Sequence, residues 1–334
     1  AALLISFSLA LSSFTLSGLT NEDGAPNLVA VGVLGFSLYM VVTYLVSRGV
    51  EGRRKATDRM VTGWVTAAFS LAVIPLVSLT WTVVEKGLNR LDADFFTQSM
   101  RNVVGAGGGA LHAIVGTLEL TGIATLISVP LGIMTAIYLV EYGRGKLARA
   151  VTFFVDVMTG IPSIVAGLFA FSLFLILLGP ASAINGFAGA ISLAVLMTPV
   201  VVRATEEMLK IVPNELREAS YALGVPKWLT ILKVVIPTAL AGIATGVIIA
   251  IARIIGETAP LLLAAGFTTS MNYNPFAEKM MTLPVFVYTS YAIQGTDFQS
   301  YIDRAWAGAL TLMIIVMVLN LIARIISKIF SPKG

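Results

Sequence analysis

The sequence predicts an all-α polytopic membrane protein with about eight transmembrane helices. Of its 334 residues, 57% are hydrophobic and only 12% are charged, whereas an ordinary soluble domain carries about 25% charged residues. The charged residues lie in short clusters between apolar stretches of roughly 20 residues, the length of helix that crosses a bilayer. A single soluble core cannot cover so many helices that are apolar on every side, so lipid is the expected surrounding.

Each apolar stretch defines one expected transmembrane helix. Pro130 and Pro162 lie inside the fourth and fifth stretches, where neighbouring helices can satisfy the carbonyl groups that a proline frees. The first stretch lacks a basic leader and a cleavage site, so it is interpreted as a span and not as a signal peptide. The expected spans are Ala1–Leu19, Leu28–Ser47, Met60–Trp81, Leu111–Val140, Val151–Leu178, Phe187–Val202, Thr238–Ala265 and Ala305–Ile326.

The distribution of basic residues predicts which side of the membrane each loop faces. If both termini are cytoplasmic, the loops on that side and the C-terminal tail hold most of the 22 Lys and Arg residues. The opposite loops then hold only Lys86, Arg90, Arg101, Lys279 and Arg304. Cytoplasmic loops are the ones enriched in Lys and Arg, so both ends of the chain are expected inside.

The spans are expected to form one membrane domain with a peripheral addition. Residues 1–59 would supply two peripheral N-terminal helices and a cytoplasmic loop, and residues 60–334 a core of six helices. A cytoplasmic hairpin at 203–237 would interrupt that core.

This hairpin has the pattern of two short amphipathic helices. Asn214 is placed to cap the first helix, and Gly224 to end it in the left-handed conformation. Pro226 would then open the second helix, where its missing N–H is tolerated. Leu216, Ala219, Ala222 and Leu223 form an apolar stripe. The pattern alone fits either a hairpin that lies on the membrane or one that docks a cytoplasmic protein.

The same hairpin resembles the EAA motif of ABC importer permeases. The resemblance rests on Glu218-Ala219-Ser220, on Gly224 five positions after Ala219, and on Ile236-Pro237, with Ser220 standing where the motif has a second Ala. In that family the loop forms a coupling helix seated in a groove of the ATP-binding subunit. The resemblance therefore implies that docking uses Glu218, Ala219, Ser220, Leu223, Gly224 and Pro226.

The seventh span contains two charged residues, Arg253 and Glu257. Arg253 lies roughly 24 Å along the helix from Pro237, too deep for its side chain to reach the surface easily, and an ionisable residue at such depth is a functional candidate. Spacing of i, i+4 predicts that the two side chains pair on one helix face. The pair is either a structural lock between helices or an anion site, since the guanidinium group binds oxyanions with two parallel hydrogen bonds. Gly256 and Pro260 allow a local break beside it.

The segment around this pair resembles the A-type permeases of bacterial phosphate ABC importers. The similar residues are Ala252-Arg253 and Gly256 to Leu262, with Gly160 to Val165, Ala136 to Tyr142 and Asn320 to Arg324, and the resemblance extends from Met60 to the C-terminus. It implies a type I importer core in a bacterial plasma membrane, with Arg253, Glu257 and Thr258 along the substrate path. Ser163 is a further candidate, because it follows Pro162, where a broken helix could restart and direct its N-terminal end to an anion. It also implies a second permease subunit, two ATP-binding subunits that hold ATP and Mg²⁺, and an extracytoplasmic phosphate-binding protein.

Other activities have little support in the sequence. The chain has no Cys and one His, His112, which excludes thiolate and multi-histidine metal sites. Gly143 to Lys146 lacks the earlier Gly and the Ser/Thr of a P-loop, so no ATPase is expected in this chain, and Gly105 to Ala110 is expected to be a flexible external loop. A permease for another tetrahedral oxyanion and a secondary anion transporter remain the alternatives.

The predicted orientation can be tested because the chain has no Cys. A single cysteine placed at Thr57 should react with a membrane-impermeant thiol reagent only after the inner face is exposed. A single cysteine placed at Thr97 should react in intact cells. The reverse labelling pattern would overturn the orientation.

Overall fold

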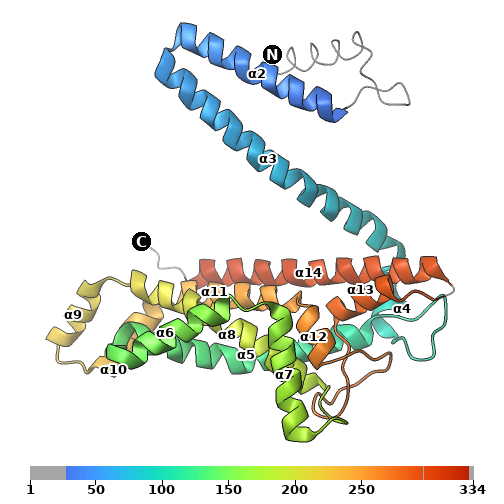
Figure 1. Ribbon diagram of the computed structural model, residues 1–334. Helices are drawn as coiled ribbons and strands as arrows, with labels where there is room; N and C mark the ends of the chain where they lie inside the picture. The colour runs from blue at the N-terminus through green and yellow to red at the C-terminus, as the bar shows by residue number, and fades with distance from the viewer. Residues whose placement is uncertain (1–27, 296, 331–334) are drawn as a thin grey trace. The chain divides into compact units, whose positions relative to one another are not determined.

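The computed structural model describes residues 28–295 and 297–330, and within these residues every regular element is a helix (Figure 1). The chain divides into two compact units within helix α3 (Arg53–Gly87), one ending at Trp81 and the other beginning at Thr82. The domain boundary predicted between residues 59 and 60 lies in the same helix and stays a prediction. The expected first span, Ala1–Leu19, lies outside the described residues.

The first unit is a helical hairpin of α2 (Leu28–Val50) and the first part of α3. Gly52 forms the turn with a φ of +88°. Beside it, Arg59 Nη2 and Glu51 Oε1 form an ion pair at 2.6 Å. The two helices contact each other through an edge-on pair of Phe36 and Trp64, whose ring centroids are 5.3 Å apart. Both helices are long and apolar enough to cross a membrane, as expected for the second and third spans.

The second unit is a bundle of long helices that run side by side in Figure 1. Its long members are α5 (Leu111–Ile137), α8 (Gly186–Ile211), α11 (Ile236–Ile255) and α14 (Phe298–Phe330). Helix α5 packs on α8, α8 on α11, and α11 on α14. Shorter elements complete the unit: η1 (Leu88–Arg90), α4 (Ala93–Thr97), η2 (Tyr138–Tyr142), α12 (Ala259–Ala264) and α13 (Leu283–Ala292).

The fifth expected span, Val151–Leu178, is not a single helix. It consists of α6 (Gly145–Thr159) and α7 (Ser163–Leu178), whose axes meet at 109°. Proline has no N–H to donate and disfavours helical geometry in the residue before it. Pro162 therefore ends the first helix and precedes the second, whereas Pro130 stays inside α5. In the described residues six helices are long enough to cross a membrane, or seven if this bent pair counts as one span.

Small residues allow the long helices to approach closely. Seven buried residues of α5 recur at every fourth position, which places them in one row along the helix. A Cβ on Gly132 would lie 2.8 Å from Cβ of Val201 in α8, and one on Gly116 would lie 2.1 Å from the carbonyl oxygen of Met281. Close approach at small residues is how helices associate in lipid. The row consists of His112, Gly116, Leu120, Ala124, Ser128, Gly132 and Ala136.

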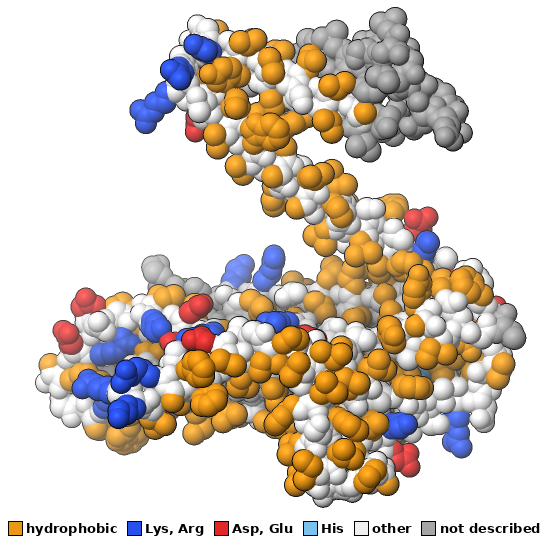
Figure 2. Space-filling model, viewed as in Figure 1, with side chains coloured by type: hydrophobic (Ala, Val, Ile, Leu, Met, Phe, Trp, Pro, Cys, Tyr) orange, Lys and Arg blue, Asp and Glu red, His pale blue; other side chains and the backbone are white. Residues whose placement is uncertain are grey.

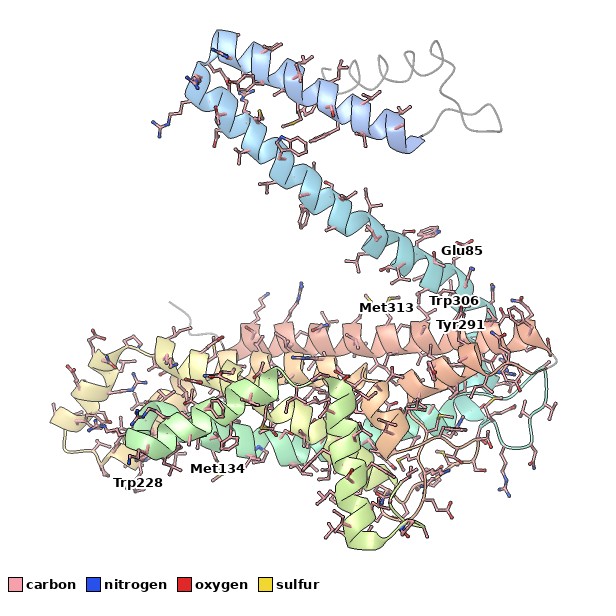
Figure 3. All side chains as sticks on the ribbon, in the orientation of Figure 1. Glu85, Met134, Trp228, Tyr291, Trp306 and Met313 are labelled. Carbon is pink, nitrogen blue, oxygen red and sulfur yellow. The ribbon has the colours of Figure 1, made fainter. Side chains whose placement is uncertain are left out.

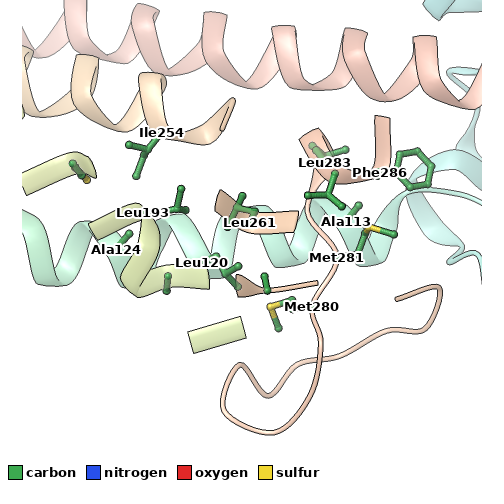
Figure 4. Packing of buried hydrophobic residues seen from close by; sticks show 14 of the residues in the cluster. Ala113, Leu120, Ala124, Leu193, Ile254, Leu261, Met280, Met281, Leu283 and Phe286 are labelled. Carbon is green, nitrogen blue, oxygen red and sulfur yellow. The ribbon is translucent and has the colours of Figure 1, made fainter. Parts of the chain in front are cut away.

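The buried residues of these helices meet in one apolar cluster, shown in Figure 4. Leu120 and Ala124 come from α5, Leu193 from α8, Ile254 from the last turn of α11 and Leu261 from α12. The cluster therefore joins the end of α11 to α12 across residues 256–258, which are not helical.

The glycine-rich segment 105–110 is held by two arginines. Arg304, which is 1% exposed, donates from Nη1 to the carbonyl oxygens of Gly105 and Gly107 at 2.7 and 3.0 Å. Arg90 donates to the carbonyl oxygen of Gly108 at 2.7 Å. The segment was expected to be a flexible loop, and its carbonyl groups instead have fixed partners on η1 and α14.

Candidate functional site

Between α8 and α11 the chain forms a helical hairpin at one end of the second unit (Figure 1). Its first arm is α9 (Asn214–Ala222) and its second arm begins with α10 (Lys227–Thr230). The hairpin was expected to start at Arg203, but α8 continues to Ile211. We call residues 212–235 the inner hairpin.

The turn of the inner hairpin is built on Gly224. Its φ is +76°, a left-handed conformation that L side chains rarely adopt. Gly224 N–H donates to the carbonyl oxygen of Tyr221 at 2.9 Å, and Val225 N–H to that of Ser220 at 3.2 Å. These two bonds form the Schellman motif that ends a helix, as predicted for Gly224.

Two expected details of the hairpin are different. Pro213, not Asn214, precedes the first helical residue, and no side chain caps the helix; Asn214 Oδ1 instead accepts from Arg217 Nη1 at 3.2 Å. Ser220 does not lie on the outer surface with its neighbours. It is 8% exposed, and its Oγ shares a 2.8 Å hydrogen bond with Oγ1 of Thr230, which closes the two arms on each other.

The outer face of the inner hairpin is exposed and partly apolar. Leu223 is 83% exposed and Trp228 is 61% exposed, and Figure 3 shows Trp228 at this end of the unit. Glu218, Ala219, Gly224 and Pro226 are exposed as well. Exposed apolar residues rimmed by polar ones are typical of a protein interaction surface.

Basic side chains surround this face. Figure 2 shows Lys and Arg side chains gathered at the same end of the unit. The exposed basic residues of the neighbouring elements are Arg144, Lys146, Arg149, Lys210 and Lys233.

A buried ion pair ties the inner hairpin to the end of α5. Arg217 in α9 donates from Nη2 and Nε to Oε1 of Glu141, at 2.9 and 3.1 Å, and the two side chains are 12% and 5% exposed. Sequence reasoning did not single out either residue for this contact. The available signal was one acidic residue at the end of the fourth apolar stretch and one basic residue in the hairpin.

The second arm of the hairpin continues without interruption into the core. Helix α10 passes through the π-helical turn η3 (Ile231–Val235) into α11, so that Lys227–Ile255 forms one helix of 29 residues. The wider turn lies directly before Pro237, which cannot donate the regular backbone bond. Ile236 N–H donates to the carbonyl oxygen of Ile231 there.

This helix ends at the predicted break. Helix α11 stops at Ile255, residues 256–258 are not helical, and α12 starts at Ala259. The expected ion pair between Arg253 and Glu257 is absent from the described ion pairs. The i, i+4 spacing brings side chains together only on a continuous helix, and the chain leaves the helix between these two residues.

Arg253 is therefore presented outward at the end of a helix. Its side chain is exposed, whereas its neighbours Ile254 and Ile255 are 1% and 3% exposed. The C-terminal end of a helix carries partial negative charge, which favours a cation in the last turn. Glu257 and Thr258 are half-buried.

The break lies against the start of α7, the second predicted part of the site. A Cβ on Gly167 would lie 2.6 Å from Cα of Pro260, so the two backbones touch. Ser163 begins α7 one turn before Gly167. Helix α7, which starts at Ser163, thus packs against α12, the helix that follows Thr258.

A cavity of about 560 Å³ adjoins the break. Thr258, Ala259 and Leu262 line it on one side and Pro284, Val287, Tyr288 and Tyr291 of α13 on the other. The hydroxyl groups of one threonine and two tyrosines are its polar groups.

Two other acidic residues have clear positions. Asp156 of α6 forms an ion pair with Arg203 of α8, which links the two helices. Arg203 also donates to Glu206 at 2.6 Å. Glu119 Oε2 is buried without a hydrogen-bond partner. Among the described residues, no group of three His, Asp or Glu side chains is placed to hold a metal ion.

Comparison with known proteins gives a consistent result. Residues 128–333 match the family described as binding-protein-dependent transport system inner membrane component. The chain is 46% identical over 285 residues to phosphate transport system permease protein PstA 1 of Mycobacterium tuberculosis, covering 84% of this chain and 92% of that protein. It is 44% identical over 283 residues to PstA of Mycobacterium leprae, covering 84% and 91%.

The fold also matches a solved transporter. A chain of a bacterial alginate ABC transporter, crystallised with an alginate pentasaccharide-bound periplasmic protein, superposes with a TM-score of 0.57. The match covers 83% of this chain and 97% of that one, at 16% identity. Identity at this level shows a shared fold alone.

The left-handed conformation of Gly224 predicts different effects for two substitutions at this position. Gly224→Val should open the inner hairpin, because a β-branched residue at positive φ costs at least about 1 kcal/mol. Gly224→Asn should leave it closed, because Asn tolerates this conformation. The measurement is amide hydrogen exchange of residues 214–230. Equal protection in both variants would contradict the assignment of the turn.

Proposed function

Because the chain belongs to the family of binding-protein-dependent transport system inner membrane components, we propose that it is the permease subunit of an ATP-driven importer of inorganic phosphate. The observation that carries the proposal is the similarity of 84% of the chain to phosphate transport system permease proteins. The exposed Arg253 beside a broken helix is compatible with an oxyanion as substrate.

The proposed complex contains four further subunits. A second permease subunit would cover the exposed face at the break, and two ATP-binding subunits would dock on the inner hairpins of the two permeases. An extracytoplasmic phosphate-binding protein would deliver the substrate. The exposed Leu223 and Trp228 support a protein partner at the hairpin, since a surface patch of this kind is otherwise unfavourable in water.

The chain would carry out transport without covalent chemistry of its own. ATP and Mg²⁺ would be bound in the partner ATPase, so this subunit is not an enzyme. It would lie in a bacterial plasma membrane as a multi-pass protein with both termini in the cytoplasm, the orientation that its basic loops favour.

The proposed mechanism is alternating access driven from the hairpin. Closure of the ATP-binding subunits would move the inner hairpin, and the unbroken helix Lys227–Ile255 would carry that motion to its far end. Because α11 ends at the break, Arg253 would change position relative to α12 and α7. The path past Arg253 would open to one side and then to the other.

Arg253 would bind the phosphate directly. Its guanidinium group is permanently charged and can donate two parallel hydrogen bonds to an oxyanion. Thr258 and Ser163 would add hydroxyl donors near the break. Glu257, which does not pair with Arg253 in this structure, would repel the anion and so limit how long it stays.

This role predicts that Arg253→Gln abolishes phosphate import. Uptake of labelled phosphate by the reconstituted complex should fall by at least about 100-fold, because a charge-assisted bidentate contact is lost. Complex assembly and basal ATP hydrolysis should persist. Labelled sulfate, measured beside phosphate, tests whether another tetrahedral oxyanion is the substrate.

Arg59→Gln is the matched control, since Arg59 pairs with Glu51 at the surface of the first unit. It should import at the unmutated rate. An Arg253→Gln complex that also imports at the unmutated rate would exclude Arg253 as the anion site. Sulfate import without phosphate import by the unmutated complex would replace the proposed substrate.

A further inference from the structure

The inner hairpin is joined to the membrane-spanning core in three ways. Two are covalent, through α8, which ends at Ile211, and through the helix Lys227–Ile255. The third is the buried ion pair of Arg217 with Glu141, which belongs to the π-helical turn η2 that follows α5. This ion pair joins the hairpin to a helix that is distant from it in sequence.

The guanidinium group of Arg217 makes several hydrogen bonds besides those to Glu141. It donates to the carbonyl oxygens of Leu209 at 2.9 Å and Val212 at 2.6 Å and to Oδ1 of Asn214 at 3.2 Å. Fixed donors in a buried site make a stiff contact, because any displacement breaks several bonds at once.

The turn η2 is also held by the second arm of the hairpin. Lys227 Nζ donates to the carbonyl oxygen of Glu141 and lies 4.9 Å from the ring centroid of Tyr142. One basic residue from each arm of the hairpin, Arg217 and Lys227, thus binds η2, which directly follows α5. A movement of the hairpin as a rigid body displaces η2 with it.

We propose that the Glu141–Arg217 pair is a positioning element that makes the inner end of α5 move together with the inner hairpin. Docking motion then reaches the core along α5 as well as along α11, and these two helices meet in the apolar cluster containing Leu120 and Ile254. Without the pair, α5 does not follow the hairpin and the pathway opens incompletely. This inference rests on the proposed function of the chain as an importer permease.

A purely structural role for the pair makes a different prediction. If the pair only keeps the hairpin folded, its loss reduces the amount of assembled complex and leaves each assembled complex fully active. If the pair transmits motion, assembled complexes hydrolyse ATP but import less phosphate for each ATP. The decisive quantity is therefore the ratio of phosphate imported to ATP hydrolysed.

The experiment uses the complete complex in proteoliposomes, with its binding protein, and compares Glu141→Gln, Arg217→Gln and Arg217→Lys. Each should lower the ratio by about 5- to 150-fold, the range of typical couplings between distant sites. The charge-swapped variant, Glu141→Arg with Arg217→Glu, should recover part of the ratio. Arg59→Gln is the matched control, because the 2.6 Å pair of Arg59 with Glu51 lies within the first unit and does not involve the hairpin.

The outcomes separate this inference from the function on which it rests. If the unmutated complex imports no phosphate, the proposed function fails. If it imports phosphate and the three single variants keep the unmutated ratio, the positioning role is wrong. Should the Gln variants fail to assemble, Arg217→Lys decides, since it retains the charge and loses the two-pronged contact; an unchanged ratio there overturns the inference.

Discussion

In lipid no water is present to hydrogen-bond with backbone groups. A transmembrane helix can therefore be interrupted only where other protein groups surround the interruption. The break at 256–258 lies where other elements replace the missing support. Ile254 and Leu261 on its two sides are buried in one apolar cluster, and Pro260 lies against the backbone of Gly167. The surrounding packing thus fixes the irregular segment and leaves Arg253 exposed at the end of a helix. A polar site in an otherwise apolar bundle depends on this arrangement.

An unbroken helix connects the inner hairpin to the break. The helix Lys227–Ile255 is unbroken because the π-helical turn η3 accommodates the missing N–H of Pro237. One end of this helix belongs to the inner hairpin and the other bears Arg253. The Glu141–Arg217 pair joins the hairpin to η2, which follows α5. In the proposed mechanism, movement of the hairpin therefore reaches the core along α5 as well as along α11.

Most of the fold could be predicted from the sequence, and the failures have physical causes. The length and apolarity of the stretches predicted the spans. Gly224 predicted the turn of the inner hairpin, and Gly256 and Pro260 predicted the interruption between α11 and α12. The 109° angle between α6 and α7 could not be predicted, because Pro130 and Pro162 look alike in sequence; the preceding Gly160 and the packing of α7 on α12 distinguish them. The predicted pair of Arg253 and Glu257 failed because helical spacing was assumed across a break. Glu141 and Arg217 are 76 positions apart, a contact that only the tertiary structure reveals.

Alternating access driven from the hairpin requires that the helix Lys227–Ile255 moves as a rigid body between the hairpin and the break. Trp228 and Ile249 are exposed near its two ends, and the absence of native Cys allows both to be replaced by spin-labelled cysteines. The distance between the labels, measured by pulsed electron paramagnetic resonance in the complete complex, should be about 30 Å. A rigid helix should give one narrow distance distribution that is the same with and without bound ATP. A distribution that shifts or broadens when ATP binds would show that the helix unwinds at η3 and would exclude rigid-body movement.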